Sequence, residues 1–371
     1  MLRSAILAIG VVCAGAQVDR DTDTTHLTAS LARVRGSLRI SGGQYMPLQA
    51  EYLKWIDARV SAGTTVAAIR KQLEQAKLNP LLGDTVTFGA SQAGFVDIRE
   101  QKVRGATDVF AITASIGVGA SCAIDETIIL YELRSRRRLA WVNADPSLKW
   151  HYYLTGIAAN HTAATGEGRL IATGWGITNC TSNWNGKAIR IDRVEPTGEL
   201  TSILKKDLAA FSGNRTEVVA PWVQLDEVTF FYDQATPLTS VLATPAIEKY
   251  RVDKLRAIRE APLGLNMLGF IVAWLSLPAQ EVSAWGSPDS TSAHQSIVAM
   301  QEKEHLGDLV DIARCGGSTW EVAVRFQHEV VFRIQGERAR QLRMVSVLPT
   351  HGRDCVVVPL KRDWLSKELP W

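Results

Sequence analysis

The spacing of hydrophobic residues predicts helices in the first part of the chain. Over residues 47–78 apolar side chains recur every three or four positions, as in Tyr52, Ile56 and Val60. This spacing places them on one face of a helix, and the small residues around Gly63 divide the segment in two. We therefore expect a helical hairpin that packs against the sheet formed by the residues after it.

From residue 84 to about residue 252 the pattern changes to short strands separated by turns rich in glycine and asparagine. Ile189 and Ile191 alternate with polar residues, which is the pattern of a half-buried strand. Many short strands with turns between them predict a sandwich, a barrel or a small propeller-like arrangement. Residues 246–260 are expected to form a helix that ends before Pro262. The expected strands cover residues 95–99, 108–116, 127–133, 169–174, 188–194 and 227–232.

The last part of the chain places helices before strands. Residues 265–277, 279–285 and 293–305 have helical patterns, and an antiparallel meander follows from about Trp320 onward. Helices laid on one face of a curved antiparallel sheet are a common α+β arrangement. The predicted fold class of the whole chain is therefore α+β, with a β-rich part followed by a smaller α+β part.

These changes of pattern divide the chain into three segments. Residues 1–16 have the pattern of a signal peptide, with Arg3 in a positive start, a short apolar run and small residues at the end. A lipid anchor on Cys13 and an uncleaved membrane anchor are the alternatives. We expect residues 17–260 to form the β-rich domain with its helical hairpin, and residues 263–371 to form the α+β domain. The apolar segment 265–277 stops at a proline and is too short for a membrane span, which takes about 20 residues.

Cysteine usage agrees with export. Without Cys13 four cysteines remain, and an even number in an exported chain favours two disulfides. The chain has no C-x-x-C motif, so neither a zinc knuckle nor a thioredoxin-like redox pair is predicted. The four positions fall into an early and a late pair. We expect the disulfides Cys122–Cys180 and Cys315–Cys355, each within its own domain.

The charge of the chain gives no basis for binding nucleic acid, which requires a dense basic face. The formal net charge is +3, and 21% of the residues are charged. The one basic run, residues 134–138, lies between two expected strands and is interpreted as a solvated hairpin loop. Contact of this loop with an anionic surface is the alternative.

No complete catalytic motif is found in the sequence. Ser121 lies in a segment that resembles a nucleophile elbow but has Ala123 in place of the second glycine. Residues 125–126 and 226–227 are pairs of adjacent carboxylates, and neighbours on a strand point to opposite faces. A glycosidase site would therefore need one carboxylate from each pair.

No metal or cofactor site is predicted either. The seven histidines are scattered, and none belongs to an H-E-x-x-H motif. His151 and His161 could meet across a hairpin to hold a metal, but solvated loop positions are the preferred interpretation. We expect no cofactor and no metal.

The least ordinary feature is a set of tryptophans in the first domain, at positions 141, 150, 175, 184 and 222. Trp184 lies in a polar loop next to Cys180, flanked by Asn183 and Asn185. A flat apolar ring beside amide donors and acceptors suits a sugar ring or a peptide. These three residues and Trp175 form the predicted ligand site. The alternative is that the tryptophans fill the core.

The leading hypothesis is an exported, disulfide-stabilised, non-catalytic binding or interaction protein, periplasmic or extracellular, whose partner is a glycan, a peptide or an envelope protein. A secreted hydrolase with a site assembled from distant residues is the first alternative, and a structural envelope component is the second. Two converging acidic residues in a cleft, or a serine–histidine contact, would favour the hydrolase. Asn-x-Thr sequons at Asn160, Asn179 and Asn214 are relevant only in a host that glycosylates secreted proteins.

Overall fold

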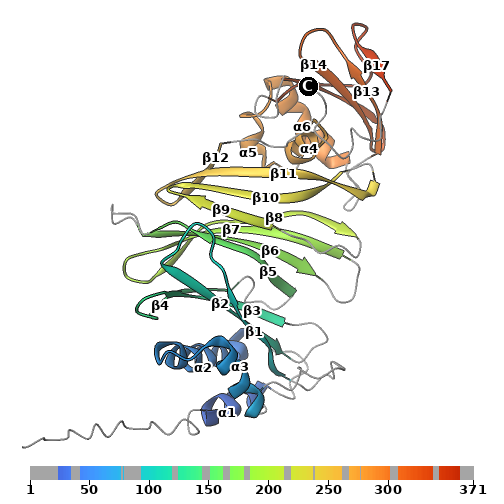
Figure 1. The fold of residues 1–371 in the computed structure, drawn as a ribbon. Helices are drawn as coiled ribbons and strands as arrows, with labels where there is room; N and C mark the ends of the chain where they lie inside the picture. The colour runs from blue at the N-terminus through green and yellow to red at the C-terminus, as the bar shows by residue number, and fades with distance from the viewer. Residues whose placement is uncertain are drawn as a thin grey trace, which may run out of the picture.

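The computed structural model arranges the chain in layers along one long axis (Figure 1). Helices lie at one end, three sheets follow in turn, and a second group of helices with a fourth sheet lies at the other end. The fold is a β-rich mixture of helix and strand, as expected, and none of the four sheets among the described residues closes into a barrel. The structure describes residues 24–34, 42–76, 78, 93–118, 124–143, 151–161, 168–178, 184–212, 219–236, 239–260, 267–275, 277–300, 308–336 and 342–359.

Three helices cover one face of the first sheet: α1 (Thr24–Val34), α2 (Gly42–Ser61) and α3 (Val66–Gln75). The sequence pattern over residues 47–78 corresponds to α2 and α3. Thr65 caps the N-terminus of helix α3, because its Oγ1 accepts a hydrogen bond from the backbone N–H of Ala68 at 3.2 Å. The apolar faces of all three helices share one core cluster with residues of β1 to β3.

Three four-stranded antiparallel sheets are stacked beyond these helices, and each is built from strands that are consecutive in sequence. Each sheet is therefore a simple antiparallel meander. Sheet A contains β1 (Ala93–Gln101), β2 (Val109–Val118), β3 (Ile124–Glu132) and β4 (Arg138–Asn143). Sheet B contains β5 (His151–Ala159), β6 (Arg169–Thr178), β7 (Trp184–Val194) and β8 (Leu200–Ser212). Sheet C contains β9 (Val219–Gln224), β10 (Glu227–Thr236), β11 (Thr239–Asp253) and β12 (Arg256–Arg259).

The helix expected at residues 246–260 is wrong. These residues form the end of β11 and the whole of β12, a hairpin in which Tyr250 pairs with Arg259. Tyr250 and Val252 are buried and alternate with exposed residues, so the true period is two. The turn is made at Lys254, which has a positive φ of 52°. The alternation is too short to be told from a helical pattern by sequence alone.

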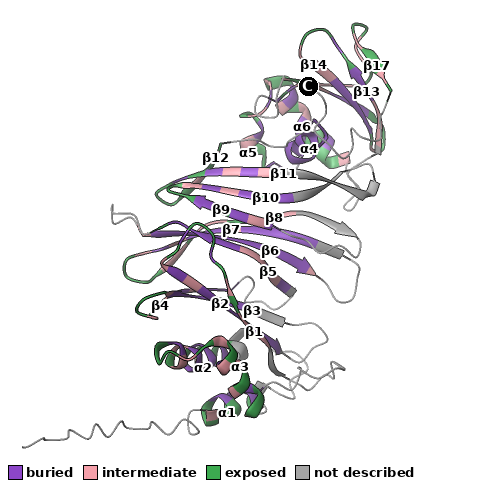
Figure 2. Cartoon of the chain, viewed as in Figure 1, coloured by how far each residue is buried: buried purple, intermediate pink, exposed green. Residues whose placement is uncertain are grey.

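The central strands of sheet B are buried on both faces, and β6 and β7 are purple over most of their described length in Figure 2. On one side, Trp175 and Ile177 belong to a core cluster that also contains Ile128 and Val142 of sheet A. The other side belongs to a separate cluster shared with sheet C. Both faces of the middle sheet must therefore be buried against another layer, and this explains why the three sheets are stacked.

Sheets B and C approach closely at the paired glycines Gly156 and Gly174. A Cβ added to Gly174 would lie 2.5 Å from the carbonyl oxygen of Val219 in β9. The hydroxyl of Thr155 donates to that same oxygen at 2.9 Å and accepts from the Val219 N–H at 3.0 Å. A side chain larger than hydrogen at Gly174 would therefore push β9 away from sheet B.

A buried asparagine makes a second polar link between these sheets. The Asn160 amide donates from Nδ2 to the carbonyl oxygen of Leu225 at 2.9 Å, and its Oδ1 accepts from the Leu170 N–H at 2.9 Å. Both ends of the side chain are thus used inside the fold. This sequon is unsuited to carry a glycan, and the sequons at Asn179 and Asn214 lie outside the described residues.

A buried carboxylate ties β8 of sheet B to sheet C. Glu248, 3% exposed, accepts hydrogen bonds from Tyr232 at 2.9 Å, Lys206 at 3.1 Å and Arg259 at 2.7 Å. Tyr250 donates to the same carboxylate. Burial alone would raise the pKa of Glu248, but the charges of Arg259 and Lys206 hold it below its usual value. Removal of either cation would leave a buried charge poorly compensated.

The remaining elements form a helical layer and a five-stranded sheet, sheet D, with the strand order β16-β15-β14-β13-β17. Every residue of α4 is buried, because this helix lies between sheet D and strands β10 and β11 of sheet C. The helices are α4 (Met267–Leu275), α5 (Ala279–Val282) and α6 (Pro288–Met300). The strands are β13 (Asp308–Arg314), β14 (Thr319–Arg325), β15 (Glu329–Gln335), β16 (Arg343–Leu348) and β17 (Val356–Val358).

Among the described helices, none has the length and apolar character needed to cross a membrane. The expected domain boundary near Pro262 lies outside the described residues. The division into residues 17–260 and 263–371 therefore stays a prediction.

We expect Gly174→Ala to lower the free energy of unfolding by about 1–3 kcal/mol, because the added Cβ would overpack the contact between sheets B and C. The matched control is Gly316→Ala, whose added Cβ meets no atom within 4 Å. Urea denaturation followed by tryptophan fluorescence measures both. Equal stability of the two variants would contradict the close contact at Val219.

Candidate functional site

A groove runs along the outer edge of sheet A, between helix α2 and the β7–β8 hairpin of sheet B. It contains a cavity of about 500 Å³ and a second cavity of about 320 Å³. The two cavities adjoin each other, because both are lined by Met46, Gln49, Arg138 and Trp141. The larger cavity is lined by Met46, Gln49, Arg138, Leu139, Ala140, Trp141, Asn143, Arg190, Gly198 and Leu200.

The floor of this groove is the backbone edge of β4. Successive side chains of a strand point to opposite faces. Ala140 belongs to the core between sheets A and B, whereas Trp141 packs on the core beneath the helices, yet both line the same cavity. A cavity reached from both faces must lie at the edge of the strand. β4 is the outermost strand of sheet A, and no strand in the described part of the chain pairs with its outer edge.

Two arginines are fixed at this edge by carboxylates on the walls. Arg138 pairs with Asp57 of α2 at 2.7 Å. Arg190 of β7 donates from Nε to the buried Asp192 at 2.8 Å and from Nη1 to the carbonyl oxygen of Asn143 at 2.8 Å. Burial raises the pKa of Asp192, and the charge of Arg190 opposes that shift.

The groove carries an excess of positive charge. Arg138, Arg190 and Lys54 line the two cavities, whereas Asp57 and the buried Asp192 are the carboxylates paired with the two arginines, which leaves an excess of one positive charge. Met46, which is 48% exposed, adds an apolar surface on the wall formed by α2. The described residues that line the two cavities include no serine, histidine or cysteine. This arrangement can hold a ligand with apolar and anionic groups.

A second cluster, on sheet D, joins a histidine to two carboxylates. His351 contacts Glu321 through Nδ1 at 2.8 Å and Asp311 through Nε2 at 2.5 Å. Glu321 is fully buried, and it also accepts from the Gly352 N–H at 3.0 Å and from Arg333 at 2.6 Å. Both ring nitrogens of His351 are occupied, so the imidazole holds the loop before β17 in place and has no free nitrogen for a substrate.

The pKa values of this cluster follow from the same contacts. Burial alone would lower the pKa of His351, but its hydrogen bonds to Asp311 and Glu321 and their charges raise it above the usual value. Burial would raise the pKa of Glu321, and hydrogen bonds from His351, Gly352 and Arg333 hold it below the usual value. The folded state therefore favours a positively charged imidazole between two carboxylates.

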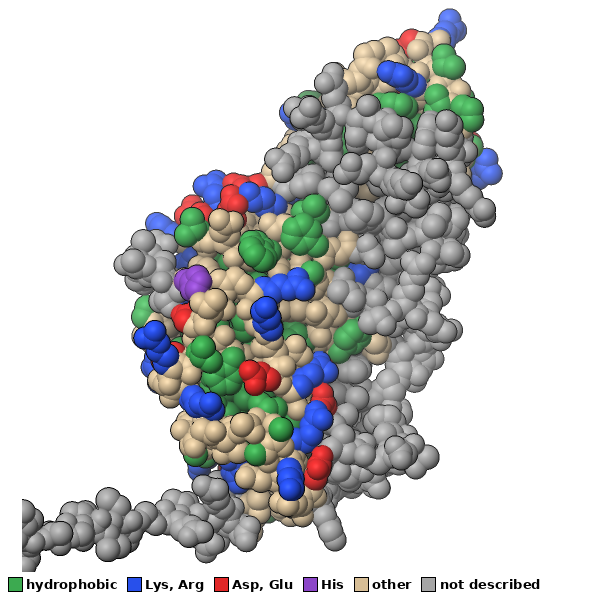
Figure 3. All heavy atoms as spheres, in the orientation of Figure 1, with side chains coloured by type: hydrophobic (Ala, Val, Ile, Leu, Met, Phe, Trp, Pro, Cys, Tyr) green, Lys and Arg blue, Asp and Glu red, His purple; other side chains and the backbone are tan. Residues whose placement is uncertain are grey.

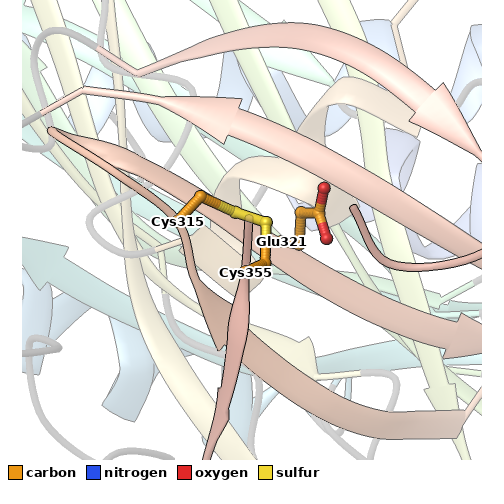
Figure 4. Close-up of side chains that lie close together, drawn as sticks. All are labelled: Cys315, Glu321 and Cys355. Atoms are coloured by element: carbon orange, nitrogen blue, oxygen red, sulfur yellow. A yellow bond between two sulfur atoms is a disulfide. The ribbon is translucent and has the colours of Figure 1, made fainter. Parts of the chain in front are cut away.

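The disulfide Cys315–Cys355 is confirmed, with a Cα–Cα distance of 4.1 Å. Figure 4 shows it beside Glu321, and one ligand atom from each of the three residues lies within 4.8 Å of the others. This spacing does not fit a metal site in the oxidised protein, because the sulfurs are bonded to each other and Glu321 already accepts several hydrogen bonds. The expected pair Cys122–Cys180 lies outside the described residues.

The predicted ligand site around Trp184 is described only in part. Trp175 is 1% exposed and donates from Nε1 to the hydroxyl of Thr173 at 2.8 Å, so it belongs to the core and not to a ligand surface. Trp184 and Asn185 begin β7, and their side chains lie outside the described part of the chain, as does the whole of Asn183. Trp184 precedes Arg190 by about 20 Å of strand. The groove lined by Arg190 is therefore distinct from the predicted ligand site around Trp184.

Among the described side chains, those of the other suggested constellations lie apart. Glu126 is buried in sheet A and pairs with Arg99 at 2.6 Å, whereas Glu227 in sheet C pairs with Lys249 at 2.7 Å. Sheet B separates these two carboxylates. His161 is exposed beside Asp108.

Two members of those constellations, Ser121 and the side chain of His151, lie outside the described residues. Within the described ranges, no hydrogen bond joins a serine to a histidine. The contact that would favour a hydrolase is therefore not formed by these residues.

The basic run at residues 134–138 is divided between a turn and a strand. The sequence pattern places Arg138 with residues 134–137 in a solvated loop, but Arg138 is the first residue of β4 and lines the groove. Lys and Arg side chains lie scattered among hydrophobic and acidic ones on the face seen in Figure 3. The described part of that face carries no dense basic surface.

Comparison with known proteins gives little. No protein-family model matches the chain, and no curated protein matches it. A prolyl endopeptidase structure is 9% identical over 68% of this chain and 27% of its own length, with a TM-score of 0.23. A β-fructofuranosidase from Microbacterium saccharophilum is 9% identical over 71% of this chain and 64% of its own, with a TM-score of 0.28. The chain spans less than two thirds of either structure, and scores this low carry no argument.

We expect His351→Gln to lose stability in a pH-dependent way. A group whose pKa is raised on folding stabilises the protein fully below its unfolded pKa, about 6.5, and this contribution is lost as pH rises through the folded pKa. The difference in free energy of unfolding between wild type and variant should therefore be largest near pH 6 and shrink toward pH 9. Urea titrations at several pH values measure it. A difference in free energy of unfolding that does not change with pH would contradict a charged imidazole between Asp311 and Glu321.

Proposed function

We propose that this chain is an exported, non-catalytic binding protein whose ligand lies in the groove along β4. The observation that carries the proposal is the open edge of β4, which bears Arg138 and Trp141 and has Arg190 of β7 on the wall beside it. Mostly apolar walls with a few placed polar groups are typical of binding sites, and such sites have volumes of about 300–1,000 Å³. The larger cavity, at about 500 Å³, lies within that range.

The charges of the groove support binding rather than hydrolysis. Its one lining carboxylate, Asp57, accepts from Tyr131 at 2.8 Å and pairs with Arg138 at 2.7 Å. A carboxylate engaged in this way by two donors is poorly placed to act as a general base, because its oxygens are already occupied. No specific observation favours the hydrolase or the structural envelope role over a binder.

Export is supported by two features of the chain. The first 16 residues have the pattern of a signal peptide, and the Cys315–Cys355 disulfide belongs to an oxidising environment. A periplasmic or extracellular location is therefore part of the proposal, with a peptide, a glycan or an envelope protein as the class of partner.

The test is a thermal-shift screen of the chain starting at Gln17 against peptide and glycan collections. A ligand at a hundred times its dissociation constant should add about 2.7 kcal/mol of stability. Arg138→Gln should weaken that ligand about tenfold or more, because it removes a charged contact from the groove. The matched control is Arg251→Gln, which removes a comparable pair with Glu260 (2.8 Å) on the outer face of sheet C.

Two outcomes would count against this site. A flat screen would contradict a peptide or glycan binder. Ligand binding that survives Arg138→Gln but is lost in Trp184→Ala would move the site to the Trp184 loop.

A further inference from the structure

We propose that the ligand is an extended acidic peptide segment of a partner protein, which adds to the outer edge of β4 as a fifth strand of sheet A. This inference rests on the proposed function of the groove and adds the chemistry of the ligand and its mode of binding.

The first argument is the backbone edge itself. An outer strand presents a row of N–H and C=O groups that can pair with another chain, and strand addition is a recurring mode of peptide recognition. The outer edge of β4 opens into a groove along most of the strand, since five of its residues line the larger cavity. Residues 138–142 span about 17 Å, which matches a segment of about five residues.

The second argument is the shape of the groove around that edge. An added strand would continue sheet A between α2 and the β7–β8 hairpin, with alternate side chains directed at the two walls. One wall offers Met46 and Lys54 of α2, and the other offers Leu200 and Gly198. A peptide would therefore be held by its backbone at the edge and by its side chains on both walls.

The third argument is charge complementarity. Arg138, Arg190 and Lys54 outnumber by one the carboxylates Asp57 and Asp192, which pair with the two arginines. Acidic side chains in the added strand would meet this excess, and basic ones would be repelled. Arg190 already holds the carbonyl oxygen of Asn143, so pairing would run from Val142 toward Arg138.

Two alternatives to peptide binding exist for the outer edge of β4: an edge protected from pairing, and an edge that pairs with a second copy of the chain. The experiments below distinguish them from peptide binding. Charged residues and irregular pairing protect many edges from other chains, and the β3–β4 register shifts between Leu130 and Tyr131. A second copy of this chain could instead pair edge to edge.

The probe is the acetylated and amidated peptide Thr-Glu-Val-Glu-Val-Thr, with a second peptide in which lysine replaces both glutamates. A third peptide carries N-methyl groups on alternate amides. We expect the acidic peptide to bind at least tenfold more tightly than the lysine peptide, and N-methylation on the edge-facing amides to abolish binding. Fluorescence anisotropy of labelled peptides measures affinity, and Arg138→Gln should weaken the acidic peptide about tenfold while Arg251→Gln leaves it unchanged.

Hydrogen exchange of the full chain separates strand addition from other binding. The acidic peptide should slow exchange of amides in residues 138–142 and leave β12, another outer strand, unchanged. Binding in the groove without this protection would overturn strand addition while the proposed function stands. Equal binding of the acidic and lysine peptides would overturn the charge argument.

Two further results would overturn the inference. Protection of β4 that rises with protein concentration and needs no peptide would assign the edge to a second copy of the chain and overturn the inference. Absence of binding by every strand-forming peptide, with a groove ligand found in the thermal-shift screen, would also overturn it.

Discussion

The rest of the structure depends on one constraint: sheet B is apolar on both faces and must be covered twice. β6 is buried along nearly its whole length, and the two sides of the sheet belong to two separate core clusters. A sheet of this kind cannot end the molecule, so sheets A and C lie on either side of it. Sheets A and C must in turn be covered on their other faces. Sheet A is covered by α1 to α3, and α4 lies between sheets C and D.

Apolar burial alone would let stacked sheets slide, and polar contacts fix their positions. Thr155 bonds both backbone groups of Val219, Asn160 bridges β6 and the β9–β10 turn, and Glu248 gathers donors from β8, β10 and β12. Each of these groups is costly to bury without its partners, so each specifies one alignment of the layers. The groove along β4 depends on that alignment, because its walls come from a helix, a strand edge and a hairpin of the next sheet.

Local patterns explain which elements could be predicted and which could not. The apolar spacing over residues 47–78 indicated α2 and α3, and the alternation around Ile189 indicated β7. The helix predicted at residues 246–260 was wrong because the buried positions of β11 include the charged Glu248. Its burial depends on Lys206 and Arg259. Helix α1, strand β5 and strand β8 carry no comparable local signal. Trp175 looked like a ligand contact but fills the core between sheets A and B.

The sequence by itself determined a β-rich mixed fold, the positions of the strongly periodic elements and the late pairing of Cys315 with Cys355. The first two follow from local periodicity, which is a property of neighbouring residues, and the third follows from the order of the four cysteines along the chain. Only the tertiary structure decided which strand is left at an edge and what lies beside it. Arg138 and Arg190 are 52 positions apart in number and belong to different sheets, yet they line one cavity. Such a juxtaposition is set by how whole sheets stack, and no spacing along the chain encodes it.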